Sequence, residues 1–142
     1  MRISIGNDHA GVDYKKYIQE YLFVKEVEVK NYGTDSLESV DYPDFAHPVS
    51  QDVNDQSSDL GILICGSGNG VCMTANKYEK VRAALCWNKE LAKLSKSHNN
   101  ANIVCIPARF VDKEKALEIV KTFISENFEG GRHERRVNKI SK

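Results

Sequence analysis

The sequence predicts an α/β protein, a three-layer α/β/α sandwich built on a five-stranded parallel, Rossmann-like sheet. Five short apolar segments alternate along the 142 residues with segments of helical periodicity, a pattern typical of parallel sheets. The third segment, Gly61 to Ile64, is a continuous aliphatic run, as expected of a strand buried on both faces. The length corresponds to about one domain and no repeat or linker divides it, so we expect residues 1–142 to form a single domain.

The first thirty residues are expected to form a strand, a helix and a second strand. Residues 2–5 are a short apolar strand candidate, and Val27 and Val29 alternate with charged residues through Asn31. Between these strands, residues 12–24 form an amphipathic helix. Its apolar and aromatic side chains recur at helical spacing, namely Tyr14, Tyr17, Ile18, Tyr21 and Leu22.

The later elements are predicted from the same periodicities. A helix begins near Pro43, because proline suits a first helical turn and Phe45, Val49 and Val53 share one face. After the central strand we expect a helix over 71–78, a strand over 81–86, a helix from about 87 to 97, a strand over 102–106 and a helix over 112–127 capped by Asp112.

The carboxyl-terminal tail, residues 130–142, starts with two glycines and continues as a basic segment. It contains too few apolar residues to pack by itself, so we expect it to lie on a partner subunit. A solvated basic tail is the alternative interpretation.

Composition excludes several classes of partner. Twenty basic and twenty acidic residues give no global positive field, so neither nucleic acid nor an acidic membrane surface is expected to bind. The apolar runs fall short of the roughly 20 residues of a membrane span, and no signal-peptide pattern is present, which predicts a soluble, cytoplasmic protein. The four cysteines lack CxxC spacing, so we expect free thiols, with no disulfide and no metal site.

A glycine-rich loop follows the central strand. Gly66, Gly68 and Gly70 alternate with Ser67 and Asn69, which allows a tight bend that turns several N–H groups toward one point. The loop lacks the last glycine of the GxGxxG motif and the Gly-Lys-Ser/Thr ending of a P-loop. No motif therefore supports a dinucleotide site or a nucleoside triphosphate site here. It predicts instead a place where an oxyanion is stabilised.

Polar residues follow the other strands as well. Ligands of parallel sheets bind beyond the carboxyl ends of the strands, and we therefore expect these residues to gather at one edge. The set comprises Asp8, His9, Cys65 to Gly70, His98, Asn99 and Arg109.

These motifs, in this order, resemble the sugar-phosphate isomerase family that contains ribose-5-phosphate isomerase of the B type and subunits of galactose-6-phosphate isomerase. The matching stretches span the chain and are Gly-Asn-Asp-His-Ala-Gly (6–11), Asp-Tyr-Pro (41–43), Ile-Cys-Gly-Ser-Gly-Asn-Gly (64–70), Ala-Asn-Lys (75–77), Ser-His-Asn (97–99) and Glu-Gly-Gly-Arg-His-Glu-Arg-Arg (129–136). The resemblance implies interconversion of ribose 5-phosphate and ribulose 5-phosphate through a cis-enediolate, in the non-oxidative pentose phosphate pathway. It also implies that no metal or cofactor is used, and that a homodimer or tetramer shares its sites between subunits.

The resemblance further implies a role for each residue. Cys65 is the base at C2, and the N–H groups of its loop are expected to favour the thiolate. Ser67 donates a hydrogen bond to the substrate, and the loop residues Gly66, Gly68, Asn69 and Gly70 hold the enediolate. His98 opens the sugar ring, Asn99 binds a hydroxyl, and Asp8 and Tyr42 orient further hydroxyls. The phosphate is bound by His9, Arg109, Arg132 and Arg136. A branch of the family has a glutamate after the loop as its base, but here position 71 is Val and position 65 is Cys.

Simpler interpretations remain for several of these residues. Cys86 and Cys105 are expected to be buried hydrophobes, and Cys72 to be a packing residue. His98 without the resemblance would be an ordinary surface histidine, and His47 and His133 have no assigned role. Two alternative functions also stay open: a hexose 6-phosphate isomerase for allose or galactose phosphates, and a non-catalytic flavin or nucleotide binder resembling flavodoxin.

Overall fold

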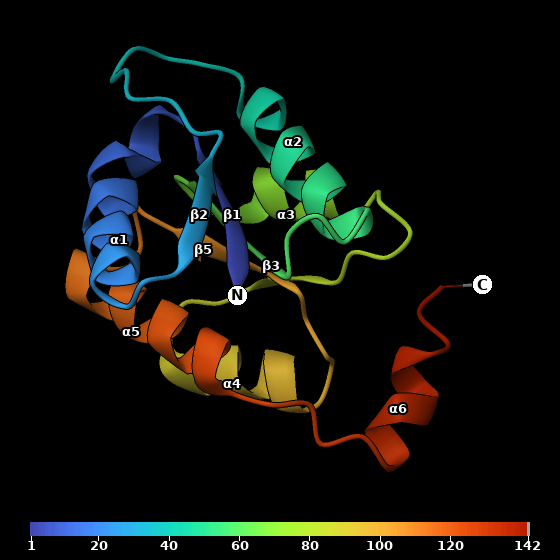
Figure 1. The fold of residues 1–142 in the computed structure, drawn as a ribbon. Helices are drawn as coiled ribbons and strands as arrows, with labels where there is room; N and C mark the ends of the chain where they lie inside the picture. Colours follow the sequence, from blue (N-terminus) through green and yellow to red (C-terminus); the bar gives the residue numbers. More distant parts are fainter. Residues whose placement is uncertain (142) are drawn as a thin grey trace.

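The computed structural model describes residues 1–141, and it confirms the predicted sandwich (Figure 1). Within these residues one parallel sheet has five strands in the order β2-β1-β3-β5-β4. The strands are β1 (Arg2–Asn7), β2 (Glu28–Asn31), β3 (Leu60–Cys65), β4 (Ala83–Leu85) and β5 (Ile103–Pro107). The helices are α1 (Val12–Val24), α2 (Tyr42–Asn54), α3 (Asn69–Ala75), α4 (Lys89–Ser97), α5 (Lys113–Ser125) and α6 (Arg132–Val137), with a short 3-10 turn at His9–Gly11.

The helices cover both faces of the sheet. Figure 1 shows α2 and α3 on one face and α1, α4 and α5 on the other. Each face has its own apolar core: one cluster includes Ile5, Ile62 and Phe123, and the other includes Val49 and Leu63. Every residue of β3 is buried because the strand lies in the middle of the sheet, which explains its uninterrupted aliphatic sequence.

Most predicted boundaries shift by one or two residues in the structure, and three differences stand out. The helix predicted over 71–78 begins two residues earlier, at Asn69, and ends at Ala75. The fourth strand pairs only over Ala83–Leu85 because it lies at the edge of the sheet, where it has β5 as its one neighbour. The tail contains the helix α6, which no apolar periodicity had indicated.

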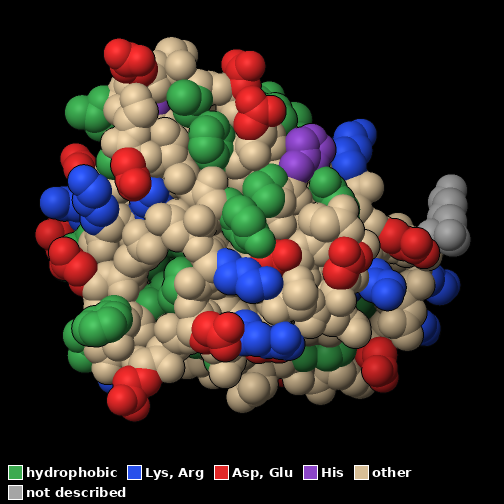
Figure 2. All heavy atoms as spheres, turned by 45° about the horizontal axis from the view of Figure 1, so that its top comes forward, with side chains coloured by type: hydrophobic (Ala, Val, Ile, Leu, Met, Phe, Trp, Pro, Cys, Tyr) green, Lys and Arg blue, Asp and Glu red, His purple; other side chains and the backbone are tan. Residues whose placement is uncertain are grey.

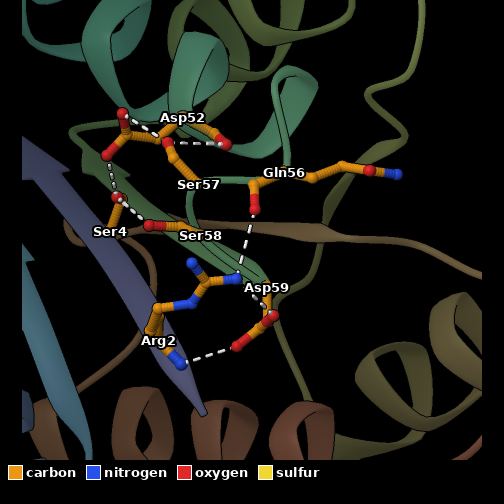
Figure 3. Close-up of polar contacts among 7 residues, drawn as sticks. All are labelled: Arg2, Ser4, Asp52, Gln56, Ser57, Ser58 and Asp59. Carbon is orange, nitrogen blue, oxygen red and sulfur yellow. Dashed lines mark hydrogen bonds and ion pairs between the residues drawn. The ribbon is translucent and has the colours of Figure 1, made fainter.

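A polar network ties the amino ends of the strands together (Figure 3). The Ser4 hydroxyl donates to Asp52 at 2.7 Å and lies 2.7 Å from the Ser58 hydroxyl, which joins β1 to the end of α2 and to the turn before β3. The Arg2 backbone N–H donates to Asp59 at 2.7 Å, and the two side chains form an ion pair. These contacts fix the register of β1 against β3. None of the helices described over residues 1–141 is long and apolar enough to cross a membrane.

Candidate active site

The carboxyl ends of β1, β3 and β5 bring a first group of predicted site residues together. Asp8 and His9 follow β1, Cys65 ends β3, and Arg109 follows β5. These strands are neighbours in the sheet, so residues far apart in sequence become adjacent. They line a pocket of about 420 Å³, whose wall is formed by Asp8, Tyr42, Cys65, Gly66, Ser67, Gly70, Arg109 and Phe110.

Cys65 lies at the bottom of this pocket and is only 4% exposed. Its Sγ accepts a hydrogen bond from the N–H of Gly68 at 3.2 Å. Burial raises the pKa of the thiol, and the nearby Asp8 raises it further, whereas the N–H groups of Val71, Gly68 and Ser67 lower it. The loop N–H groups thus favour the thiolate as expected, but the net direction of the Cys65 pKa is upward. The reason is that burial outweighs the amide dipoles.

The glycines of the loop are required by close approaches. Gly68 adopts φ +74°, and a Cβ there would lie 2.4 Å from the side chain of Leu85. A Cβ on Gly70 would lie 2.4 Å from the ring of Tyr42, which is therefore packed directly over the loop. Because α3 has only seven residues, individual N–H groups rather than a long helix dipole supply the donors at this point.

Arg109 is held against the same loop. Its N–H donates to the carbonyl of Gly66 at 3.0 Å, and a Cβ on Gly66 would lie 3.2 Å from the Arg109 side chain. The neighbouring N–H of Ala108 donates to the carbonyl of Cys65 at 2.9 Å. The guanidinium therefore lies against Gly66 in the wall of the pocket that Cys65 also lines, and it can bind an anionic group of a ligand there.

His9 is oriented by the long loop of residues 32–41. The N–H of Val40 donates to Nδ1 of His9 at 3.2 Å, so Nδ1 is the acceptor and Nε2 is left to carry the proton. The same loop is anchored by Lys15, whose side chain is fully buried and bonds the carbonyl of Thr34 at 2.9 Å and Asp35 at 2.7 Å. No pattern in the sequence indicates this anchor, because a lysine in a helix is normally exposed.

The second group of predicted site residues lies at the opposite edge of the sheet, and the prediction that all of them meet at the carboxyl edge is wrong. Helix α4 connects the parallel strands β4 and β5, so it runs back along the sheet and ends near the amino end of β5. His98 and Asn99 follow α4 and lie there. Consistently, Asn100 lines a different pocket together with Arg2 and Asp59, from the amino ends of the strands.

Helix α6, with Arg132 and Arg136, lies at the same distant edge. The N–H of Glu129, just before this helix, donates to the carbonyl of Ser97 at 3.0 Å, and both arginines are exposed. In a single copy of the chain these residues are therefore separated from Cys65 by the length of the sheet.

His98 forms a cluster with two residues that the sequence did not single out. Its ring stacks on His133, with centroids 4.1 Å apart and planes 12° apart. The Nε2 atoms of His98 and His133 lie 3.9 Å and 3.5 Å from one carboxylate oxygen of Glu129. His133 had no assigned role, and its burial becomes visible only when α6 is packed beside the end of α4.

The same three side chains are the candidate metal ligands within residues 1–141, since their ligand atoms lie within 4.8 Å of one another. A metal must lie close to the plane of each coordinating imidazole, along the nitrogen lone pair. Two stacked and nearly parallel rings do not direct their lone pairs at a common point. The cluster therefore fits a stacked histidine pair better than a metal centre.

An apolar surface borders the carboxyl-edge pocket. Leu85, Trp87, Pro107 and Phe110 line an adjoining hollow, and Trp87 and Phe110 are 52% and 75% exposed. Figure 2 shows one face of the molecule, on which apolar side chains lie among charged ones of both signs. Exposed aromatic side chains next to a ligand pocket are typical of surfaces that bind a partner.

The other cysteines agree with their expected packing roles. Cys86 and Cys105 are buried, and burial raises the pKa of Cys86 to about 11. Cys72 is partly exposed and donates to the carbonyl of Ala83 at 3.4 Å.

Comparison with known proteins gives consistent matches over the full length. Residues 3–140 match the sequence profile of the Ribose/Galactose Isomerase family. A probable ribose-5-phosphate isomerase B from Mycoplasma genitalium is 47% identical over 97% of this chain and 92% of its own length, and ribose-5-phosphate isomerase B from Escherichia coli is 40% identical over 99% and 94%. The crystal structure of a ribose 5-phosphate isomerase from Thermotoga maritima has a TM-score of 0.95 at 48% identity, covering 99% of this chain and 97% of the other. The structure of the M. genitalium protein with bound ribulose-5-phosphate has a TM-score of 0.94 at 47% identity, covering 98% and 93%.

Proposed function

This chain belongs to the ribose/galactose isomerase family, and we propose that it interconverts D-ribose 5-phosphate and D-ribulose 5-phosphate through a cis-enediolate. The observation that carries the proposal is the buried Cys65 thiol in a loop of N–H donors, with the Arg109 side chain packed against the same loop. The ribulose-5-phosphate bound to a 47% identical relative supports the pentose substrate. The family match also favours an isomerase over a flavodoxin-like binder.

Cys65 carries the proton in this mechanism. The thiolate takes the proton from C2 of the open-chain aldose while the electron pair moves to the C1 carbonyl oxygen, which gives the enediolate. The same thiol then returns the proton to C1 while the proton of the C2 hydroxyl moves to O1, and the ketone forms at C2. The N–H groups of the glycine loop and the hydroxyl of Ser67 stabilise the enediolate oxygens, because fixed donors in a water-poor pocket need no reorganisation. A thiol of raised pKa is the stronger base once it is ionised.

The phosphate lies between the two edges of different subunits. His9 and Arg109 bind it from the carboxyl edge of one copy, and Arg132 and Arg136 bind it from the amino edge of a second copy. His98 and Asn99 of the second copy open the sugar ring and bind a hydroxyl, while Asp8 and Tyr42 of the first copy orient the sugar. The separation of the two groups within one chain supports a homodimer with shared sites, and the apolar surface around Trp87 and Phe110 supports the contact.

The purified protein should convert ribose 5-phosphate in the presence of EDTA, and Cys65→Ala should reduce exchange of the C2 proton to near background. Cys86→Ala is the matched control, because it removes a buried thiol outside the pocket. No turnover by the wild-type protein would refute the proposed reaction. Wild-type exchange by Cys65→Ala would move the base to another residue.

We also propose that the enzyme works in the cytoplasm, in the non-oxidative pentose phosphate pathway. The free thiols suit a reducing compartment.

A further inference from the structure

The stacked pair His98 and His133 is held by three segments that are distant in sequence. His98 follows α4, Glu129 lies in the segment after α5, and His133 is in the first turn of α6. Backbone bonds fix two of these segments: Glu129 N–H donates to Ser97 at 3.0 Å, and His133 N–H donates to Gly130 at 3.1 Å. The arrangement does not depend on the side chains alone, so the two rings meet in a defined orientation.

Burial singles out His133 on its helix. Within α6, Arg132 to Val137, it is the one buried residue, 8% exposed, whereas both of the phosphate-binding arginines proposed above are exposed. Figure 1 shows α6 beyond the end of α4, joined to α5 by an extended segment. The contact with His98 therefore places α6 against the rest of the chain and, at the same time, gives the His98 ring a flat surface to lie on.

The surroundings of His133 favour the neutral form of its ring. Its pKa is lowered first by burial and then by the positive charge of His98 and of Arg132, with a smaller effect of Arg136, while the carboxylate of Glu129 opposes these effects. The two rings are stacked, and the Glu129 carboxylate faces the Nε2 edge of both.

We propose that His133 and Glu129 are positioning residues for the ring-opening step, which hold the His98 ring in the orientation needed to transfer a proton to the sugar. This inference rests on the proposed function, in which His98 opens the ring. The stack limits rotation of the His98 ring about its side-chain bonds, and Glu129 fixes the direction of its Nε2 edge. His133 and Glu129 do not contact C1 or C2 of the sugar in this arrangement. The proton transfer between these carbons and Cys65 should therefore not depend on them.

The two directions of the reaction separate ring opening from proton transfer. Ribose 5-phosphate is mostly a closed furanose, whereas ribulose 5-phosphate is acyclic, because its O5 carries the phosphate. His133→Ala should lower kcat for ribose 5-phosphate at least about tenfold with little change in KM. Deuterium exchange from solvent into C1 of ribulose 5-phosphate, followed by NMR, should stay within about twofold of the wild type.

Conservative and control variants sharpen the test. His133→Phe retains a flat ring and should recover most of the forward rate, and Glu134→Gln, an exposed carboxylate on the same helix, should behave as the wild type. If His133→Ala does not fold, Glu129→Ala at its exposed position gives the same comparison, with an expected loss of about threefold in the forward direction only.

Equal losses in both directions, or a KM that rises in both, would show that His133 only anchors the arginines of α6 and would overturn the proposal. A wild-type protein that isomerises neither sugar would instead refute the proposed function.

Discussion

At the scale of single residues, the environment of each thiol decides its chemistry. Four cysteines lie on or beside three neighbouring strands, yet their pKa values diverge. Burial raises the pKa of Cys65 and Cys86, whereas a hydrogen bond with Cys105 lowers that of Cys72. The sequence indicated which cysteine lies at the glycine-loop pocket, but not the direction in which its pKa moves, because that direction depends on how deeply the fold buries the thiol.

Alkylation with iodoacetamide should therefore modify Cys72 before Cys65 near neutral pH, since the thiolate is the reactive form. The rate at Cys65 should keep rising with pH beyond about 8.5, the ordinary pKa of a thiol. Peptide mass spectrometry after short reactions at several pH values gives both rates in one sample. A Cys65 rate that is already constant at neutral pH would show that the loop N–H groups outweigh burial.

At the scale of elements, two polar contacts fix pieces of chain that have no regular structure of their own. The first is the anchor of the loop 32–41, in which buried Lys15 bonds Thr34 and Asp35 and the loop in turn bonds His9 through Val40. Orientation of His9 thus depends on a lysine on the neighbouring helix. The second is the network at the amino ends of the strands, around Asp52 (Figure 3).

Lys15→Met removes the loop anchor while it keeps an unbranched apolar side chain in the same space. We expect the KM for the sugar phosphate to rise several-fold, because His9 loses its fixed orientation, with a smaller effect on kcat. Amide hydrogen exchange over residues 34–40 should become faster. Lys16→Met, at an exposed position of the same helix, is the control, and an unchanged KM in Lys15→Met would disconnect the loop from the site.

Asp52 should contribute a pH-dependent part of the stability. Burial alone would raise its pKa, but hydrogen bonds from Ser4, Tyr32 and Ser57, together with the charge of Lys30, hold it below the ordinary value. A lowered folded-state pKa stabilises the protein above the unfolded value of about 3.9, and this contribution is lost as the pH falls through the folded value.

Asp52→Asn should therefore lower the free energy of unfolding at pH 7 by about 1–2 kcal/mol. The difference from the wild type should shrink as the pH is lowered below about 4. Urea unfolding at several pH values measures it, with the exposed Asp55→Asn as control. If the difference in free energy of unfolding between the two proteins stays constant with pH, the charge of Asp52 does not contribute to stability.

At the scale of the whole molecule, the two sets of predicted site residues lie at opposite edges of one sheet. Cys65 and Arg109 are at the carboxyl edge, and His98, Arg132 and Arg136 are at the amino edge. No rearrangement of side chains can bring them together within one copy. A symmetric pair of copies can, since the amino edge of each copy can then face the carboxyl edge of the other.

Mixing two inactive variants tests this arrangement. If Cys65→Ala and His98→Asn are denatured together and refolded, about half of the dimers should contain one chain of each kind. Each mixed dimer has one site in which both residues are intact, so about a quarter of the wild-type activity towards ribose 5-phosphate should return. Sites built from a single chain would give no recovery, because every chain carries one of the two substitutions. Sedimentation of the mixture checks that dimers have formed.

The sequence by itself determined the sandwich, the five strands, most of the helices and the glycine-rich loop that follows the central strand. It could do so because apolar periodicity and glycine spacing are local properties of the chain, and local backbone preferences decide them. The bounds of α1 and the strand status of residues 60–65 were predictable for this reason.

Only the tertiary structure decided where those groups lie. The sequence places His98 after a helix. The edge of the sheet at which His98 lies is decided by α4, which connects the parallel strands β4 and β5 and so ends near the amino end of β5. The role of His133 and the burial of Lys15 likewise arise from contacts between segments distant in sequence. Such contacts depend on how the layers pack and not on the residues near them in the chain, which is why the division of the predicted site residues between two edges could not be read from the sequence.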